Sequence, residues 1–200
     1  MPAIRDDVIP TERLMLRPWR HDDLDAYFDI YSRPEVMHWL GTARQPLASR
    51  EEAVERLAGR AAPDPEGAPY GVWAVCEAGT DLPLGSVLLR LLPWSATLRP
   101  VPGAQDPEIG WHLHPDVWGR GYATEAAGAI LDRAWAHGLT EVHAVTYPDN
   151  VRSQAVCRRL GMTHLGRTDR YYDAELELFR LAQRPKRSAS SAAGATSSWS

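Results

Sequence analysis

Hydrophobic residues in the first third of the chain follow the two-residue period of a strand and then the longer period of helices. Residues 10–18 alternate apolar and polar side chains up to a proline, which predicts a short strand. Residues 22–32 carry leucine and aromatic side chains at helical spacing, so we expect an amphipathic helix whose aromatic stripe packs in the core. Ser49 and Glu52 form a capping-box pattern, which predicts a second helix to about residue 60.

Turn-forming residues divide the middle of the chain. A loop rich in proline and glycine at 63–69 precedes two expected strands, 70–76 and 84–92, with their hairpin connection at 81–85. Segment 93–107 then carries four prolines and is too long for a tight hairpin turn. This segment is either the rim of a binding site or a plain connection between strands.

The second half of the chain alternates strands and helices. We expect strands at 108–114, 142–147, 163–167 and 174–181, and helices from 123 to a glycine cap at 138 and from 151 to 160. Because strands precede, separate and follow the helices, the predicted fold class is α+β with a mixed central sheet. Residues 1–181 should form a single domain, and residues 182–200, rich in serine and alanine, a disordered tail.

Charge and cysteine content argue against several classes of protein. Lys and Arg number 22 against 26 Asp and Glu, so the chain lacks the basic footprint of a nucleic-acid-binding protein. Cys76 and Cys157, the only cysteines, cannot build a disulfide framework or a metal quartet, and no metal site is expected. No secretory signal and no stretch near the roughly 20 apolar residues of a membrane span is found, so we expect a cytoplasmic protein without a membrane partner.

A glycine-containing turn joins the strand at 108–114 to the following helix. Gly119 and Gly121 bracket Arg120, and the first N–H groups of the helix have no partner within the helix. Those groups and the helix dipole suit a phosphate, although a plain strand-to-helix turn would use the same glycines. A dinucleotide fingerprint would need a third glycine where Thr124 stands, and a Walker loop is absent.

Three segments occur in the order typical of one family. They read TERLMLRPW, EIGWHLHPDVWGRGYATEA and NVRSQAVCRRLGM. In these segments the chain resembles the GNAT-superfamily N-acetyltransferases, and among them the ribosomal-protein-alanine (RimJ/RimL-type) group. The resemblance implies a GNAT-type fold, with a mixed, mostly antiparallel central sheet flanked by helices, and an acetyl-CoA-dependent N-acetyltransferase activity.

The resemblance also implies which residues hold acetyl-CoA. The pantetheine arm would pair with the main chain of Trp111, His112 and Leu113. Asn150 and Ser153 match an Asn-x-x-Ser pattern beside the thioester, and Asn150 also suits a helix N-cap. The pyrophosphate would bind the backbone amides of Gly119, Arg120, Gly121, Tyr122, Ala123 and Thr124.

Acetyl transfer needs a base for the amine and an acid for the leaving thiolate. Glu108 is the first choice as base, and an ordinary strand-edge carboxylate is the alternative. Many GNAT enzymes carry a tyrosine acid where this chain has Cys157, so either Ser153, Tyr171 or Tyr172 takes that role or the coenzyme A thiolate leaves with little help. His112 and His114 lie on the same face of the strand as Glu108. They could form a proton relay or a metal-binding pair, or they could be ordinary polar strand residues.

The sequence leaves the acceptor open. An α-amine with a pKa of about 7.7 to 8 is about one-tenth neutral at pH 7, whereas a lysine amine is neutral only about once in 2,500. An N-terminal or other low-pKa amine therefore needs less help from a base. The resemblance to the ribosomal-protein group alone implies that the leading acceptor is a protein or peptide N-terminal amine, acetylated by direct transfer in a ternary complex. A small-molecule amine is the alternative, and a non-catalytic acyl-CoA-binding module is another. Whether a second copy of the chain joins in a homodimer also stays open.

Overall fold

The computed structural model describes residues 8–41, 45–98 and 105–183. Most of the expected tail, residues 184–200, and part of segment 93–107 therefore lie outside the described residues. None of the helices in the described ranges has the length and apolarity that crossing a bilayer would require.

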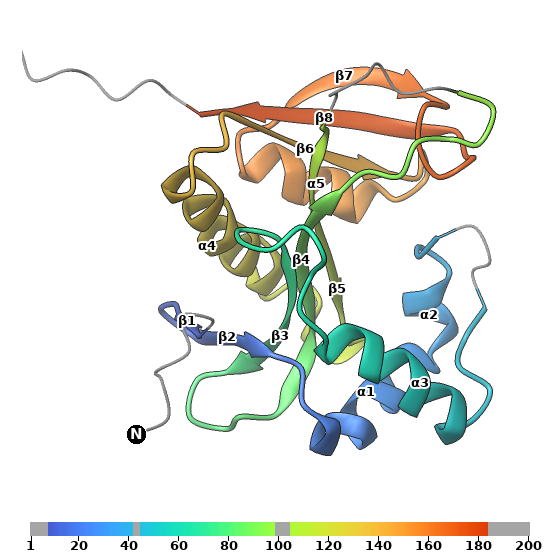
Figure 1. Cartoon of the computed structure of the whole chain (residues 1–200), viewed down its shortest axis with the longest axis vertical. Coiled ribbons are helices and arrows are strands. Elements are labelled where there is room, and N and C mark those ends of the chain that lie inside the picture. The colour runs from blue at the N-terminus through green and yellow to red at the C-terminus, as the bar shows by residue number, and fades with distance from the viewer. Residues whose placement is uncertain (1–7, 42–44, 99–104, 184–200) are drawn as a thin grey trace, which may run out of the picture.

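A single mixed sheet runs through the described part of the chain (Figure 1). Its eight strands lie in the order β1-β2-β3-β4-β5-β6-β8-β7, and all neighbours are antiparallel except β5 and β6. The predicted α+β class with a mostly antiparallel sheet is confirmed. The strands are β1 (Ile9–Pro10), β2 (Leu14–Pro18), β3 (Gly71–Glu77), β4 (Pro83–Leu91), β5 (Pro107–Leu113), β6 (Glu141–Thr146), β7 (Thr163–Thr168) and β8 (Leu176–Ala182).

Helices cover both faces of the first half of the sheet. In Figure 1, α4 lies on one side of β3 to β5, and α1, α2 and α3 lie on the other. The 3-10 turns η1 (His21–Asp23) and η2 (Pro115–Val117) precede α1 and the glycine turn. The helices are α1 (Leu24–Tyr31), α2 (Pro34–Met37), α3 (Arg50–Ala61), α4 (Tyr122–Ala136) and α5 (Val151–Arg159).

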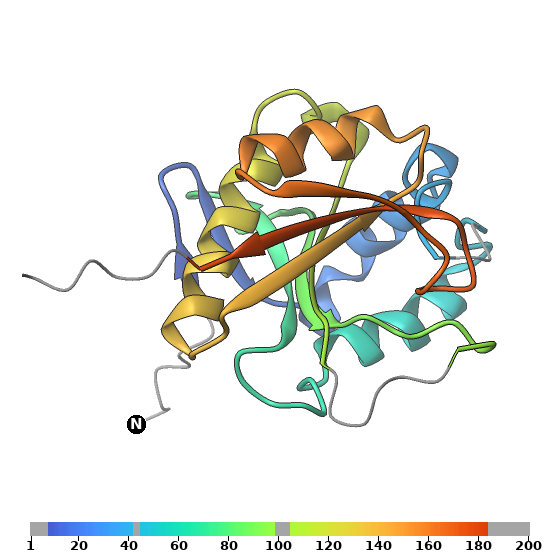
Figure 2. The ribbon, with the colours of Figure 1, turned by 90° about the horizontal axis from the view of Figure 1, so that it is seen from above.

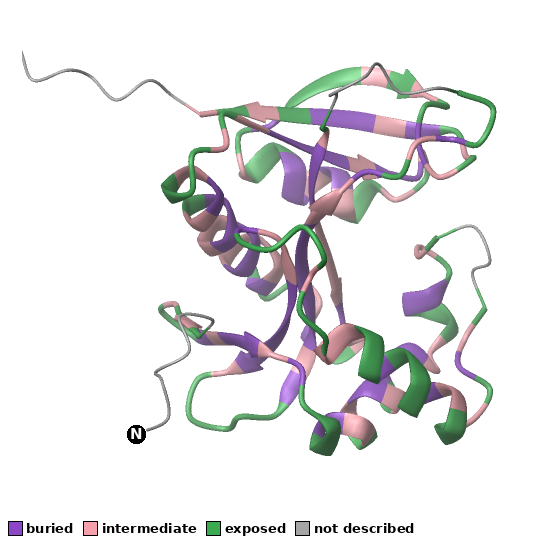
Figure 3. Ribbon diagram, viewed as in Figure 1, coloured by how far each residue is buried: buried purple, intermediate pink, exposed green. Residues whose placement is uncertain are grey.

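Alternation of side chains along β3 explains this two-sided packing. Trp73 and Val75 join the core beneath α4, whereas Val72, Ala74 and Cys76 join the core beneath α1 and α3. Both cores consist of buried apolar side chains, and the buried residues follow the strands and the inner sides of the helices in Figure 3. The first half of the sheet is thereby fixed between two helical layers.

The two halves of the sheet separate at β5 and β6. Only Glu108 and His143 are paired between these parallel strands in the described chain. The strands β6, β8 and β7 run across the end of the first half, as Figures 1 and 2 show from two directions. Side chains from both halves line a cavity beside β5 and β6.

Most element boundaries agree with the sequence predictions, and the aromatic stripe of α1 is buried as expected. Ser49 accepts the Glu52 N–H at 3.2 Å, but the Glu52 carboxylate accepts from the N–H of Ala48 instead of closing the box on Ser49. Gly138 has a φ of 86° just after α4, as a helix-ending glycine should. The short elements β1, α2 and the two 3-10 turns carry no periodic pattern long enough to predict them.

Candidate active site

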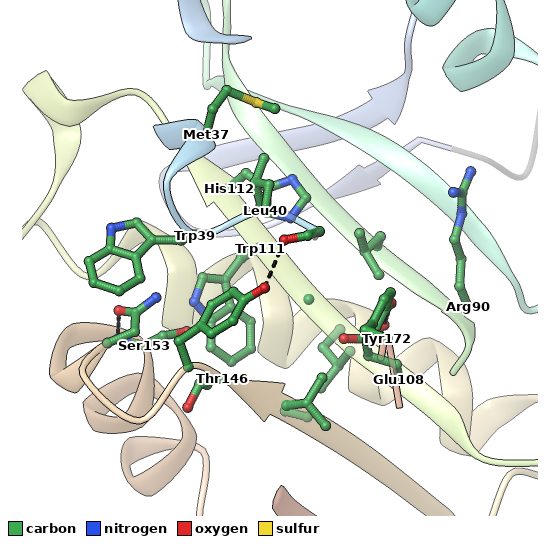
Figure 4. Close-up of a pocket in the computed structure, with 18 of the residues that line it drawn as sticks. Met37, Trp39, Leu40, Arg90, Glu108, Trp111, His112, Thr146, Ser153 and Tyr172 are labelled. Atoms are coloured by element: carbon green, nitrogen blue, oxygen red, sulfur yellow. Dashed lines mark hydrogen bonds between the residues drawn. The ribbon is translucent and has the colours of Figure 1, made fainter. Parts of the chain in front are cut away.

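Two cavities meet where β5 and β6 separate. One, of about 850 Å³, lies between the end of β5, the turn at 118–124 and the start of α5. The other, of about 560 Å³, lies between β5, β6 and the layer of α1 to α3. We call them the turn cavity and the inner cavity. Both are lined by Trp39, Leu40, Trp111, His112, Asn150 and Ser153, which therefore mark the junction (Figure 4).

The glycine turn forms one wall of the turn cavity. Gly119 and Gly121 have φ of 79° and 83°, in the left-handed region that favours glycine. Gly121 is the residue before the first turn of α4, so the free N–H groups of a 15-residue helix begin beside it. All six residues predicted for the pyrophosphate, 119 to 124, line this cavity.

Two side chains in the turn differ in what they can offer a ligand. The hydroxyl of Thr124 is buried without a hydrogen-bond partner among the described residues, as expected of a group whose partner is a ligand. The hydroxyl of Tyr122 donates to Glu77 at 2.7 Å, so Tyr122 can contribute only its main chain to the cavity.

Two arginines of α5 line the same cavity as Arg120. Arg152 and Arg159 lie seven residues apart, on one helical face, and Arg152 stacks over the Trp118 ring with 5.0 Å to its centroid. These arginines suit the phosphates of a nucleotide-bearing ligand. The sequence analysis missed them, although their seven-residue spacing after Asn150 was a visible signal.

The edge of β5 offers main-chain groups to the gap. The N–H of His114 donates to a carbonyl of β4, and peptide groups of successive strand residues point to opposite edges. The peptide groups of Trp111 and Leu113 therefore point toward β6, with which β5 pairs only at Glu108. The indole of Trp118 donates to the Leu113 carbonyl at 2.7 Å, so the Trp111 peptide group is the freer of the two.

Asn150 and Ser153 begin α5 at the cavity junction. The Asn150 side chain accepts the Ser153 N–H at 3.1 Å, which makes Asn150 the N-cap of the helix. Both residues also line both cavities, so the cap fixes their position beside a ligand. The capping prediction is confirmed, and a ligand contact by the same residue is compatible with it.

Glu108 lies in the inner cavity, at the point where the strands separate. It is 7% exposed, and its Oε2 accepts a hydrogen bond of 2.5 Å from the Tyr172 hydroxyl. Burial raises the pKa of Glu108 to about 7, against the opposite effects of the Tyr172 hydrogen bond and the Arg90 charge. In Figure 4 Glu108 and Ser153 lie at opposite ends of the cavity, so the structure does not bring them into contact.

His112 lies at the junction with its ring inside the protein. Its Nδ1 is 3.5 Å from the Tyr31 hydroxyl, which is bonded to Ser86 at 2.6 Å. Burial, followed by the charges of Arg60 and Arg90, lowers the pKa of His112 to about 3, so its ring is neutral at physiological pH.

His114 is separated from this group. Its ring lies near Asp29 and Asp116, at 3.2 and 3.6 Å, and it lines neither cavity. Within the described ranges no three His, Cys, Asp or Glu side chains are grouped so as to hold a metal. A relay from Glu108 through both histidines therefore has no support in this geometry.

The candidates for a general acid differ in their access. Cys157 is fully buried in the core beneath the sheet, and burial raises its thiol pKa to about 12. The Tyr171 hydroxyl donates to Asp106 at 2.8 Å, and this residue lines neither cavity. Tyr172 lines the inner cavity but donates to Glu108. Of these residues and Ser153, only Ser153 lies at the junction.

The fold agrees with what comparison with known proteins finds. The family model described as an acetyltransferase (GNAT) domain matches residues 13–163. The chain belongs to the GNAT acetyltransferase family. The resemblance inferred from the sequence is confirmed, and a ribosomal-protein acetyltransferase is among the structural neighbours.

Two curated relatives and one solved structure are among the most similar proteins. An uncharacterized N-acetyltransferase, YoaA, of Bacillus subtilis is 26% identical over 161 residues, covering 80% of this chain and 84% of that protein. FsC-acetyl coenzyme A-N(2)-transacetylase of Aspergillus fumigatus is 28% identical over 172 residues, which cover 82% of this chain and 68% of that protein. The structure of RimL, a ribosomal L7/L12 alpha-N-protein acetyltransferase in complex with coenzyme A, superposes with a TM-score of 0.68 at 16% identity, covering 88% and 98%.

Membership of the family makes the protein an acetyl-CoA-dependent N-acetyltransferase. The turn cavity fits that cosubstrate on its own evidence, because it combines the start of α4, an unpartnered Thr124 hydroxyl and three arginines. The inner cavity adjoins the turn cavity through six shared lining residues.

Proposed function

We propose that this GNAT protein acetylates a primary α-amine by direct transfer in a ternary complex, with Glu108 as the base. The observation that carries the proposal is a buried glutamate with a pKa of about 7 in the inner cavity. Of the described residues that line either cavity, Glu108 is the only carboxylate. A base with this pKa is matched to an amine whose own pKa is about 7.7 to 8.

Direct transfer is supported by what lies at the junction. The two cavities share six lining residues, which supports holding both substrates side by side at the same time. The Cys157 thiol is buried away from both cavities and is largely protonated at neutral pH, so it is a poor nucleophile for an acetyl-enzyme. Neutral His112 at the junction does not compete for the amine proton, because its pKa is about 3.

The residues divide the chemistry among them. Acetyl-CoA, when bound, supplies an acetyl group activated as a thioester and a leaving thiol. Glu108 accepts the proton that the amine loses, either directly or through bridging water in the inner cavity. The Trp111 N–H at the free edge of β5 donates to the oxygen on which negative charge develops. Ser153 at the junction holds the proton for the departing thiolate.

The acceptor amine is proposed to be the N-terminus of a peptide or protein. The fold shared with the ribosomal alpha-N-protein acetyltransferase is compatible with a protein acceptor. The name of the Aspergillus relative, an acetyl coenzyme A-N(2)-transacetylase, does not mention a protein acceptor. The α-amine is the shared chemistry, and a small α-amine would use the same base.

The test is release of coenzyme A thiol from acetyl-CoA, measured for N-terminal peptides and small amines between pH 6 and 9. We expect kcat/KM to rise with pH through about 7, because the carboxylate form of Glu108 is the active one, and again as the amine itself loses its proton. Glu108→Gln should lower kcat by about 10² to 10⁴ and remove the rise near pH 7, leaving the rise of the amine.

Glu35→Gln is the matched control, because Glu35 is an exposed glutamate of α2 that lines neither cavity. A loss of less than about threefold in Glu108→Gln, with a folded protein, would assign the base to another group. Absence of thiol release with every amine would contradict the proposed function itself.

A further inference from the structure

The charge inside the inner cavity is opposite to that of the chain as a whole. The chain has a formal net charge of -4, yet Arg56, Arg60 and Arg90 line this cavity and Glu108 is its only carboxylate among the described residues. Arg56 pairs with Glu52 along α3. Arg60 and Arg90 come from different elements, α3 and β4, and reach the same cavity.

These two guanidinium groups lack full partners. Nη1 of Arg60 and Nε of Arg90 are buried and make no hydrogen bond within the described chain. Arg90 Nε lies 3.5 Å from the Asp64 carboxylate, an ion pair without a hydrogen bond. The Arg60 guanidinium lies 5.9 Å from the Tyr31 ring centroid and also interacts with the Tyr27 side chain, while its Nη1 keeps no partner among the described residues. Buried unpaired donors of this kind are costly unless a ligand accepts from them.

The two arginines also act on each other and on the cavity. The pKa of Arg90 is lowered by burial first and by the charge of Arg60 second. Both charges add to the lowering of the His112 pKa. Arg90 stands opposite Glu108 in the β4–β5 register, and Figure 4 shows Glu108 next to Tyr172, on the same side of the cavity as Arg90. The cavity therefore holds an excess of positive charge close to the proposed base.

An acceptor with only a neutral or cationic body would leave the buried donors of Arg60 and Arg90 without a strong acceptor. We propose that the acceptor carries an anionic group, a carboxylate or a phosphate, which Arg60 and Arg90 bind while its amine lies toward Glu108 and the junction. Charge-assisted hydrogen bonds from guanidinium to these groups are the strong ones in proteins. This inference rests on the proposed function and narrows its substrate class to anionic α-amines.

The test compares acceptors that differ in one charge and keep a similar α-amine. The peptide pair begins Ala-Glu or Ala-Gln, and the small-molecule pair is the α-amide of glutamate and the α-amide of glutamine. We expect the wild-type protein to favour the carboxylate member by about 10- to 100-fold in kcat/KM, in whichever pair is used. The two pairs distinguish a peptide acceptor from a small one.

The arginine variants then assign the preference. In Arg60→Gln and Arg90→Gln the ratio of kcat/KM between carboxylate and amide acceptors should fall by about tenfold or more. Arg50→Gln is the control, because Arg50 lies on the same helix, pairs with Asp25 and lines neither cavity. Coenzyme A affinity and thermal unfolding report whether each variant is folded.

The outcomes separate the two proposals. Turnover of both members of each pair at equal kcat/KM would overturn this inference and leave the proposed function standing. A preference that survives both arginine variants would remove these residues as its cause and overturn the assignment. No transfer to any acceptor would overturn the proposed function and this inference with it.

Discussion

At the residue scale, Glu108 shows how an ordinary side chain acquires a specific chemistry. Its place at the start of a strand marked it as a candidate base in the sequence, but a strand-edge carboxylate exposed to water would titrate near 4.3. Burial where β5 and β6 separate raises its pKa to about 7, and the Tyr172 hydrogen bond limits that rise. Tyr172 therefore adjusts the pKa of the proposed base.

Removal of that hydrogen bond should move the pH dependence. In Tyr172→Phe the ionised form of Glu108 loses a charge-assisted donor, so its pKa should rise and the limb near pH 7 should shift upward by about one to two pH units. The measurement is kcat/KM against pH. Tyr171→Phe is the control, because that hydroxyl bonds Asp106 and the residue lines neither cavity. The same dependence of kcat/KM on pH in both variants would show that Tyr172 does not set the pKa of the group that titrates near pH 7.

At the element scale, α4 is used for what its first turn leaves unbonded. The helix is held by its buried face, including Ala127, Ile130 and Ala134, beneath the sheet. Its start is left at the turn cavity by two left-handed glycines, where a side chain would be strained. The same helix ends at Gly138 in the same backbone region, which provides an internal comparison.

A charged side chain at the start of α4 should weaken the binding of acetyl-CoA. In Gly121→Glu the new carboxylate lies beside the proposed pyrophosphate site, and like charges about 4 Å apart repel by about 1 to 4 kcal/mol, so affinity should fall by about tenfold or more. Gly138→Glu has a comparable φ, open space for its Cβ and a position at the far end of α4. Both variants should lose about 1 to 2 kcal/mol of stability from backbone strain.

The comparison is made by calorimetric titration with acetyl-CoA. Unchanged affinity in a folded Gly121→Glu protein, or an equal loss in Gly138→Glu, would contradict the assignment of residues 119–124 to the pyrophosphate.

At the scale of the whole molecule, the segment after β4 ties the two halves of the sheet together. Ser95 Oγ donates to the Asp169 carbonyl at 2.6 Å and accepts the Asp173 N–H at 3.1 Å. The turn between β7 and β8 that it holds carries Tyr172, whose φ of 60° is in the left-handed region. None of the described residues of 93–107 lines the inner cavity, so this segment acts on the cavity through the β7–β8 turn.

Removal of the Ser95 hydrogen bonds should lower stability and acceptor kinetics without changing acetyl-CoA affinity. In Ser95→Ala two backbone groups lose a partner, so stability should fall by about 1 to 3 kcal/mol and kcat/KM for the acceptor by about tenfold as Tyr172 and Glu108 lose their alignment. Acetyl-CoA affinity should stay within about twofold. Thr80→Ala is the control, because its hydroxyl also makes two hydrogen bonds with the backbone, in the β3–β4 turn. An equal fall in kcat/KM for the acceptor in both variants would contradict the role of Ser95 in positioning the β7–β8 turn.

Local features were readable from the sequence. The Ser49 and Asn150 caps, the helix-ending Gly138 and the glycine turn each depend on a few neighbouring residues, so their patterns are complete within one stretch of chain. The α+β class followed in the same way from the order of periodic segments. The three ordered segments also identified the family, which the match over residues 13–163 confirms.

Only the tertiary structure decided which distant side chains share a cavity. Arg60, Arg90 and Tyr172 come from α3, β4 and the β7–β8 turn, and nothing near them in the sequence relates one to another. The separation of β5 from β6 brings them beside Glu108 and buries that carboxylate, which changes its pKa. The sequence determined the glycine turn because short-range geometry forms it, whereas the electrostatics of the inner cavity depend on long-range packing and burial.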